Sequence, residues 1–201
     1  MSTRRVVLAT GNPGKLGEMR SILAVHGLEA VAQSELGIVP PVEDGDSFVA
    51  NALIKARHAA AIASLPAIAD DSGLEVDALG SRPGVHTARY AGPVADERAN
   101  NEKLLAELSG VPAGRRGARY RCAMVFVREA DDPAPIVAEA SWQGQIGFER
   151  RGSGGFGYDP LFIVGGGTVT AAEMSAADKN RVSHRGKALA ELATRMKDAG
   201  W

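Results

Sequence analysis

Short apolar runs alternate with helical segments along this chain, and this alternation limits the fold more than any other feature. Arg4 to Thr10 predicts a short buried strand, because a β-branched run is ended there by Gly11. A helix follows from about Lys15 to His26 and stops at Gly27. Ala67 to Asp70 predicts a second buried strand. Strands joined by helices in this way indicate an α/β arrangement.

The rest of the chain continues the mixture of helices and strands. A second helix carries an apolar stripe at helical spacing, marked by Phe48, Ala52, Ala56, Ala59 and Ala63. Residues 80–95 look like a long loop. The other expected elements are a helix from Glu97 to Leu108, an antiparallel pair of strands from Tyr120 to Val127 and Ile136 to Trp142, a strand from Leu161 to Val164, and a helix from Ser183 to Lys197. No linker divides the chain, so we expect one α/β (mixed α+β) domain over residues 1–201.

The composition is that of an ordinary globular chain and excludes several classes of protein. Hydrophobic residues make up 45% and charged residues 23% of the chain, which excludes disordered and collagen-like sequences. The net charge of −1 argues against binding to a nucleic-acid backbone. The one cysteine, Cys122, excludes an intrachain disulfide and fits a reducing compartment. Because the apolar run after Arg5 is too short for a signal peptide or a membrane span, we expect a cytoplasmic protein without a membrane partner.

A turn between the first strand and the first helix is a candidate anion site. Backbone N–H groups, a helix N-terminus and a lysine together can hold a phosphate. The turn differs from a P-loop, because Leu16 follows the Gly-Lys pair and Ala9 stands where the first glycine belongs. The alternative interpretation is a plain strand–helix turn. The candidate binding residues are Thr10, Gly11, Asn12, Pro13, Gly14 and Lys15.

Two adjacent carboxylates, Asp70 and Asp71, come directly after the apolar run 67–69. Such a pair is costly when buried unless a cation or a polar network offsets it. Hard oxygen ligands suit Mg²⁺, and a remaining carboxylate can take a proton from water. The alternative is an ordinary turn, which the preceding apolar residues disfavour. Glu43, before the second helix, is a further candidate ligand, and Ser72 adjoins the pair.

A glycine-rich loop with two aromatic residues and an aspartate spans residues 152–160. An aromatic ring in such a loop can stack on a planar base. The alternative is a flexible loop whose aromatic residues lie in the core. The candidate binding residues are Phe156, Gly157, Tyr158 and Asp159.

Three cationic or donor side chains, Lys179, His184 and Arg185, lie at or before the start of the last helix. Helical spacing places His184 four residues before Ala188 and Arg185 four before Leu189, on the inward side of that helix. Inward-facing donors need an acceptor. A carboxylate of the protein is one answer, and a carbonyl or phosphate of a ligand is the other.

Taken in this order, these segments resemble the inosine/xanthosine triphosphate pyrophosphatase family, the Ham1-like nucleotidases, over essentially the whole chain. Two further segments add to the resemblance, namely Glu43-x-Gly45-x-Ser47-Phe48-x-x-Asn51-Ala52 and Pro83-Gly84-Val85-His86-Thr87-Ala88-Arg89-Tyr90. One position departs from the family, which usually has glutamate where this chain has Ala50. With Ser47 as N-cap, the alanine forgoes a capping box worth roughly 0.5–1 kcal/mol.

The resemblance implies hydrolysis of ITP, dITP and XTP to the monophosphate and pyrophosphate, with Mg²⁺ as cofactor. It also implies a mixed sheet in two lobes around a central cleft, and a homodimer. Asp71 would then activate water for attack at the α-phosphorus, and Glu43, Asp71 and Asp70 would be the metal ligands. Lys15 would neutralise the triphosphate, and Phe156 would stack on the base.

Base choice follows from the chemistry of carbon 6. Hypoxanthine and xanthine carry a keto oxygen there, whereas adenine carries an amino donor, so the N–H donors of His184 and Arg185 predict rejection of ATP. Two alternatives remain open: a binding module that senses altered nucleotides without cleaving them, and a pyrophosphatase for another modified nucleotide. The paired acids argue against the first, because carboxylates repel a triphosphate unless a metal lies between them.

Overall fold

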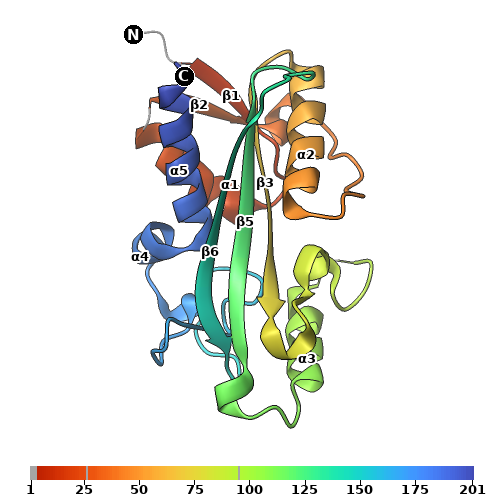
Figure 1. Ribbon diagram of the computed structural model, residues 1–201, viewed down its shortest axis with the longest axis vertical. Helices are drawn as coiled ribbons and strands as arrows, with labels where there is room; N and C mark the ends of the chain where they lie inside the picture. Colours follow the sequence, from red (N-terminus) through yellow and green to blue (C-terminus); the bar gives the residue numbers. More distant parts are fainter. Residues whose placement is uncertain (1–3, 26, 95) are drawn as a thin grey trace. The chain divides into compact units, whose positions relative to one another are not determined.

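The computed structural model describes residues 4–25, 27–94 and 96–201, and their contacts divide the chain into two compact units (Figure 1). Unit 1 consists of Met1–Asp71, Cys122–Ala140 and Arg185–Trp201, and unit 2 of Ser72–Arg121 and Ser141–His184. The helices are α1 (Pro13–Val25), α2 (Phe48–Ala63), α3 (Glu97–Glu107), α4 (Ala176–Val182) and α5 (His184–Asp198). The strands are β1 (Arg4–Leu8), β2 (Leu28–Ala32), β3 (Ala67–Val76), β4 (Arg82–Pro83), β5 (Gly117–Val127), β6 (Ile136–Ile146) and β7 (Phe162–Val164).

Unit 1 is a sheet covered by helices on both faces, with β1 parallel to β2 and β3. Alternate residues of β1 point in opposite directions: Val6 and Leu8 pack in the core with α1 and α5, while Val7 packs in the core with α2. Figure 1 shows α1 and α5 on one side of these strands and α2 on the other. Parallel strands buried on both faces need apolar residues at successive positions, which explains the unbroken apolar runs in the sequence.

The ends of α2 follow from its sequence. The Ser47 hydroxyl caps the helix by accepting a hydrogen bond from the Ala50 N–H at 3.2 Å. At the other end Ser64 takes a left-handed conformation, with φ of 52°. The buried face consists of Ala52, Ala56 and Ala59, which are fully covered. Alanines on this face let the helix lie close against the strands.

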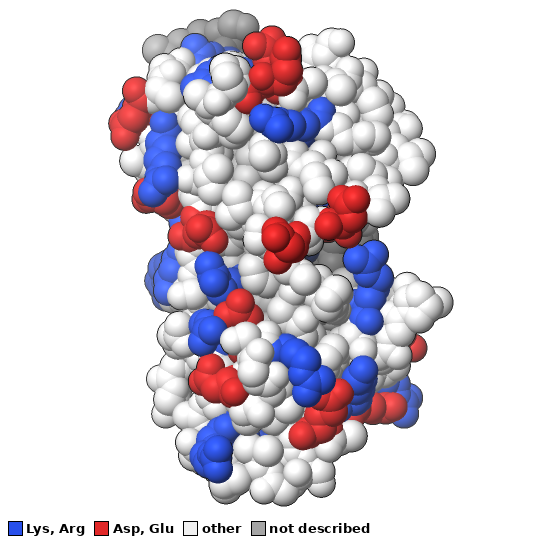
Figure 2. Space-filling model, turned by 45° about the vertical axis from the view of Figure 1, so that its right-hand side comes forward, with Lys and Arg blue, Asp and Glu red and all other residues white. Residues whose placement is uncertain are grey.

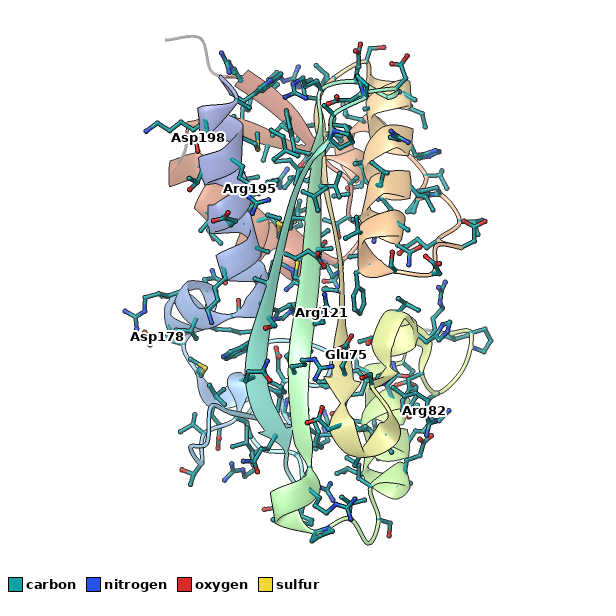
Figure 3. All side chains as sticks on the ribbon, in the orientation of Figure 1. Glu75, Arg82, Arg121, Asp178, Arg195 and Asp198 are labelled. Atoms are coloured by element: carbon teal, nitrogen blue, oxygen red, sulfur yellow. The ribbon has the colours of Figure 1, made fainter. Side chains whose placement is uncertain are left out.

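Unit 2 contains the other ends of three strands. Within this unit β4 pairs antiparallel with β3, and β7 pairs antiparallel with β6. Its core combines aromatic residues of the strands and of the 152–160 loop with Leu104 and Leu108 from α3 and the residue after it. On β3, Glu75 faces β5 and forms ion pairs with Arg119 at 2.7 Å and Arg121 at 3.9 Å (Figure 3).

Most predicted elements are present, and two predictions need correction. β3 does not end at Asp70 but continues to Val76, because Leu74 and Val76 are fully buried and extend the strand past the Ser-Gly pair. The expected loop 80–95 contains β4 and a 3-10 helix, Gly84–Arg89. The strand β2 and the helix α4 were not predicted. The predicted end of the first helix, His26, lies outside the described residues. Within the described residues, no helix is long and apolar enough to cross a membrane.

Candidate active site

A group of charged side chains surrounds Asp70 and Asp71 in unit 1; we call it the charged cluster. The strand β3 places both aspartates in the middle of its length, where they are buried, and side chains from α1, α2, α5 and the turn before α2 reach them. Its members are Lys15, Glu43, Lys55, Asp70, Asp71 and Arg185.

Asp70 is fully buried between two cations. Its carboxylate lies 2.9 Å from the Lys15 ammonium and 3.3 Å from Nε of Arg185. Burial opposes ionisation, but Lys15 and Arg185 outweigh it and hold the pKa of Asp70 well below the ordinary carboxyl range. Asp70 is therefore ionised at neutral pH, and it fixes the positions of both cations.

Asp71 lies in a different environment from its neighbour. One carboxylate oxygen lies 3.3 Å from the Lys55 ammonium, and the other accepts a hydrogen bond from the Asn51 amide at 3.2 Å. Burial raises the pKa of Asp71 above the ordinary carboxyl value and outweighs the attraction of Lys55 and Lys15. A carboxylate with a raised pKa is a better proton acceptor than an ordinary one, as a general base requires.

The turn before α2 brings Glu43 to the same lysine, with 3.0 Å between the carboxylate and the Lys55 ammonium. Asn51 ties this turn to the strand, since its amide oxygen accepts a hydrogen bond from Gly45 N–H at 2.8 Å while its amide nitrogen donates to Asp71. A Cβ at residue 45 would meet the Asn51 oxygen at 2.7 Å, so only glycine fits there. Asn51 thus positions both carboxylates that face Lys55.

The predicted anion-binding turn is built differently from the sequence expectation. Asn12 caps α1: its side-chain oxygen accepts hydrogen bonds from the N–H groups of Gly14 at 2.9 Å and Lys15 at 3.1 Å. The Asn12 N–H donates to the Thr10 hydroxyl at 3.2 Å, and Pro13 has no N–H. Three of the backbone donors expected to serve an anion are therefore used inside the turn. The charged group of this turn is the Lys15 ammonium, which is paired with Asp70.

Three residues of the charged cluster and its surroundings were missed as functional candidates. Lys55 and Asn51 lie four residues apart on one face of α2, and both are buried. A lysine and an asparagine on the buried face of an alanine-rich helix are the sequence signal, because a buried charge needs a partner. Glu18 on α1 was also missed; it forms an ion pair with Arg185 at 2.6 Å.

The donor set of the charged cluster fits a magnesium ion. Glu43 and Asp71 present anionic oxygens to one shared position, where the Lys55 ammonium lies. Among the described residues, no three His, Cys, Asp or Glu side chains form a metal-binding group. Mg²⁺ is often held by one or two carboxylates, with waters and substrate phosphates as its other ligands, so these two are a sufficient protein contribution.

A second group of candidates lies in unit 2; we call it the aromatic set, and it consists of Tyr120, Trp142, Phe156, Asp159, Lys179 and His184. Asp159 is its centre: its carboxylate accepts hydrogen bonds from Phe156 N–H at 2.9 Å and Tyr120 hydroxyl at 3.3 Å. The Lys179 ammonium lies 2.6 Å from the same carboxylate and 4.7 Å from the centre of the Phe156 ring. A Cβ on Gly155, which has φ of +71°, would collide with Asp159, so the loop needs glycine there.

The side chains of the 152–160 loop and of His184 differ in what they offer a ligand. Phe156 is half-buried, whereas Tyr158 is buried and donates its hydroxyl hydrogen to the Thr87 carbonyl at 3.0 Å. His184 is 4% exposed, and its ring stacks on Tyr120 with 4.7 Å between ring centres. The inward direction predicted for His184 and Arg185 is confirmed, and of the two acceptors considered for Arg185 the structure supplies protein carboxylates, Asp70 and Glu18.

The surface adds an electrostatic observation. Basic and acidic side chains are interspersed on the face drawn in Figure 2, without a continuous basic band. This pattern agrees with the near-zero net charge.

Known proteins resemble this chain over nearly its whole length. A protein named "dITP/XTP pyrophosphatase" from Methylococcus capsulatus is 60% identical over 194 residues, covering 96% of each chain. Another of the same name from Thioalkalivibrio sulfidiphilus is 55% identical, covering 96% of this chain and 98% of its own. The solved structure of a HAM1 protein from Coxiella burnetii, 42% identical, superposes with a TM-score of 0.88 over 97% of this chain and 99% of that one. The Ham1 family pattern matches residues 6–195, and the chain belongs to the Ham1 family.

Proposed function

We propose that this chain is a nucleoside-triphosphate pyrophosphohydrolase that cleaves dITP, XTP and ITP to the monophosphate and pyrophosphate. The observation that carries the proposal is Asp71, a buried carboxylate with a raised pKa between a cation and an amide donor. The names of the relatives, which are 55–60% identical, support the substrate class. The activity removes deaminated purines from the nucleotide pool.

Asp71 acts as the general base. It takes a proton from a water molecule, whose oxygen forms a bond to the α-phosphorus, and the bond from that phosphorus to the bridging oxygen breaks, releasing pyrophosphate. Asn51 orients the carboxylate, and the Lys15 ammonium attracts the negative phosphate oxygens. Mg²⁺, held by Glu43 and Asp71 with Asp70 as a further candidate ligand, would supply charge neutralisation at the phosphates when bound. The residues of the turn 10–14 and Ser72 would lie beside the phosphates.

Recognition of the purine ring of the nucleotide is assigned to residues of unit 2 and to Arg185. Phe156 offers a ring face for stacking, supported by Lys179, while Gly157, Tyr158 and Asp159 shape the loop that carries it. His184 and Arg185 supply donors to the keto oxygen at carbon 6. The proposed enzyme is a single pyrophosphatase domain over residues 1–201.

The assembly of the protein is proposed on the resemblance alone, and its location on the proposed substrates. A homodimer is the expected unit, and light scattering of the purified chain tests it. The cytoplasm is the expected compartment, because the substrates are soluble nucleotides of the cellular pool.

A nucleotide panel tests the proposal. Pyrophosphate and phosphate release are measured with dITP, XTP, ITP, dGTP, ATP and a modified pyrimidine triphosphate, each with and without Mg²⁺. We expect rapid pyrophosphate release from the first three with Mg²⁺ only. Tight binding of ITP without release would indicate a sensor, and preference for the modified pyrimidine would indicate a different house-cleaning pyrophosphatase.

A further inference from the structure

The Lys55 ammonium lies where the two proposed metal ligands converge. It is 3.0 Å from a Glu43 carboxylate oxygen and 3.3 Å from an Asp71 carboxylate oxygen. The side chain enters from the buried face of α2 and is only 10% exposed. The position between the carboxylates is thus held by a cation that the chain itself provides.

Two carboxylates act on this ammonium at short range. One oxygen of Glu43 and one oxygen of Asp71 lie within 3.3 Å of the Lys55 nitrogen. A divalent ion that approaches Glu43 and Asp71 must therefore displace the Lys55 ammonium or be repelled by it.

We propose that Lys55 is a resident counter-cation that occupies the metal position in the free enzyme and makes divalent-ion binding dependent on the nucleotide. This inference rests on the proposed function, which assigns Glu43 and Asp71 as the metal ligands. A triphosphate changes the balance, because its oxygens supply ligands to the ion and a new acceptor for the displaced ammonium. Lys55 is in this sense a positioning residue that holds the two carboxylates together until the metal replaces it.

Lys15 provides a matched comparison within the same cluster. It is also a lysine paired with a buried aspartate, at 2.9 Å, but its partner is Asp70 and it makes no ion pair with Glu43 or Asp71 among the described contacts. Removing Lys15 takes away the same charge from the cluster without vacating the shared position.

The test measures metal binding without nucleotide. Wild type, Lys55→Met and Lys15→Met are titrated with Mn²⁺, and free Mn²⁺ is followed by electron paramagnetic resonance. We expect Lys55→Met to bind Mn²⁺ at least about tenfold more tightly than wild type, because two facing carboxylates lose their cation. Lys15→Met should stay within about threefold of wild type. Equal or weaker binding by Lys55→Met, or an equal gain in Lys15→Met, would overturn the proposal.

A melting experiment covers the case in which Lys55→Met folds poorly without metal. Mg²⁺ should raise the melting temperature of Lys55→Met by more than that of wild type, since the ion replaces the missing charge. A Mg²⁺ response no larger than that of wild type would count against the proposal. Because neither readout uses turnover, a failure here is distinct from a failure of the nucleotide panel, which addresses the proposed function.

Discussion

The charged cluster of unit 1 and the aromatic set of unit 2 both contain buried charged side chains, but these side chains have different effects in the two regions. Asp70 and Asp71 are adjacent on one strand, yet cations lower the pKa of the first while burial raises the pKa of the second. In the aromatic set the buried ion pair of Asp159 and Lys179 instead fixes a loop and supports a ring. Buried charges and burial thus change the pKa values of the proposed reactive groups in the charged cluster, whereas in the aromatic set a buried ion pair holds a loop in place.

Asp71→Asn should produce the largest effect, because it removes the proposed base from the charged cluster. We expect kcat for dITP to fall by about a thousandfold or more, measured as pyrophosphate release, since general-base and metal-ligand roles are lost together. Urea unfolding should show that the variant still folds. Asp198→Asn, at an exposed position on α5, is the control and should keep normal turnover (Figure 3). Near-normal turnover in Asp71→Asn would mean that another group is the base.

Asp70→Asn should act mainly on stability. Removing one partner from a buried charge network costs about 3–5 kcal/mol, whereas Glu191→Gln, in an exposed pair with Arg195, should cost about 0.5 kcal/mol or less. Because the pKa of Asp70 is lowered by folding, its contribution is complete above the unfolded pKa near 4 and is lost as the pH falls further. Urea unfolding is therefore measured at pH values from 7 to 3. Between pH 4 and pH 3 the free energy of unfolding should fall less steeply for Asp70→Asn than for wild type. An equal fall in both proteins would show that protonation of Asp70 does not cause the loss of stability at acidic pH.

Arg185→Ala tests whether this residue recognises the purine of the nucleotide or only stabilises the protein. It is proposed to donate to the purine, but its ion pairs are with Glu18 and with Asp70 of the charged cluster. We expect kcat/KM for ITP to fall more than that for ATP, narrowing their ratio by roughly tenfold or more, since a donor to the keto oxygen is lost. Steady-state kinetics with both nucleotides measure the ratio. Equal losses would show that Arg185 serves only Asp70 and Glu18.

Phe156→Ala should have the smallest effect of the four and should weaken binding more than chemistry. Loss of one stacking face should raise KM for dITP by roughly tenfold and leave kcat within about threefold. Phe148→Ala is a matched control in the same unit, since this ring is 64% exposed and lies over Arg116 rather than near Asp159. A fall in kcat with unchanged KM would contradict a base-stacking role.

The sequence was sufficient for the parts of this structure that depend on periodicity and local chemistry. The stripe on α5, including Leu189 and Leu192, is buried as predicted, and the Ser47 cap of α2 is present. The pattern could not reveal that β3 continues beyond Asp71, because Asp-Asp-Ser-Gly has turn-forming composition and only neighbouring strands decide otherwise.

The sequence was enough to name most of the candidate site residues, but it was not enough to predict which of them contact each other. Asp70 and Asp71 could be named because paired acids after an apolar run demand a partner, and Glu43 because it lies in the turn before the second helix and in a segment that resembles the family. That the partner of Glu43 and Asp71 is Lys55 depends on how α2 packs on the sheet, which spacing alone does not specify. For the same reason the two neighbours His184 and Arg185 could not be assigned from sequence to an aromatic environment and an ionic one, respectively.

Unit 1 is assembled from three separate stretches of chain, and this has a consequence for biosynthesis. Val6 and Leu8 share their core with Leu192 and Met196, so the first strand meets partners that are synthesised only after all the other described strands. Contacts between residues this far apart along a chain form slowly. A nascent chain therefore carries the exposed apolar face of β1 until α5 emerges, and we expect chaperones that shield such faces to raise the yield of folded protein.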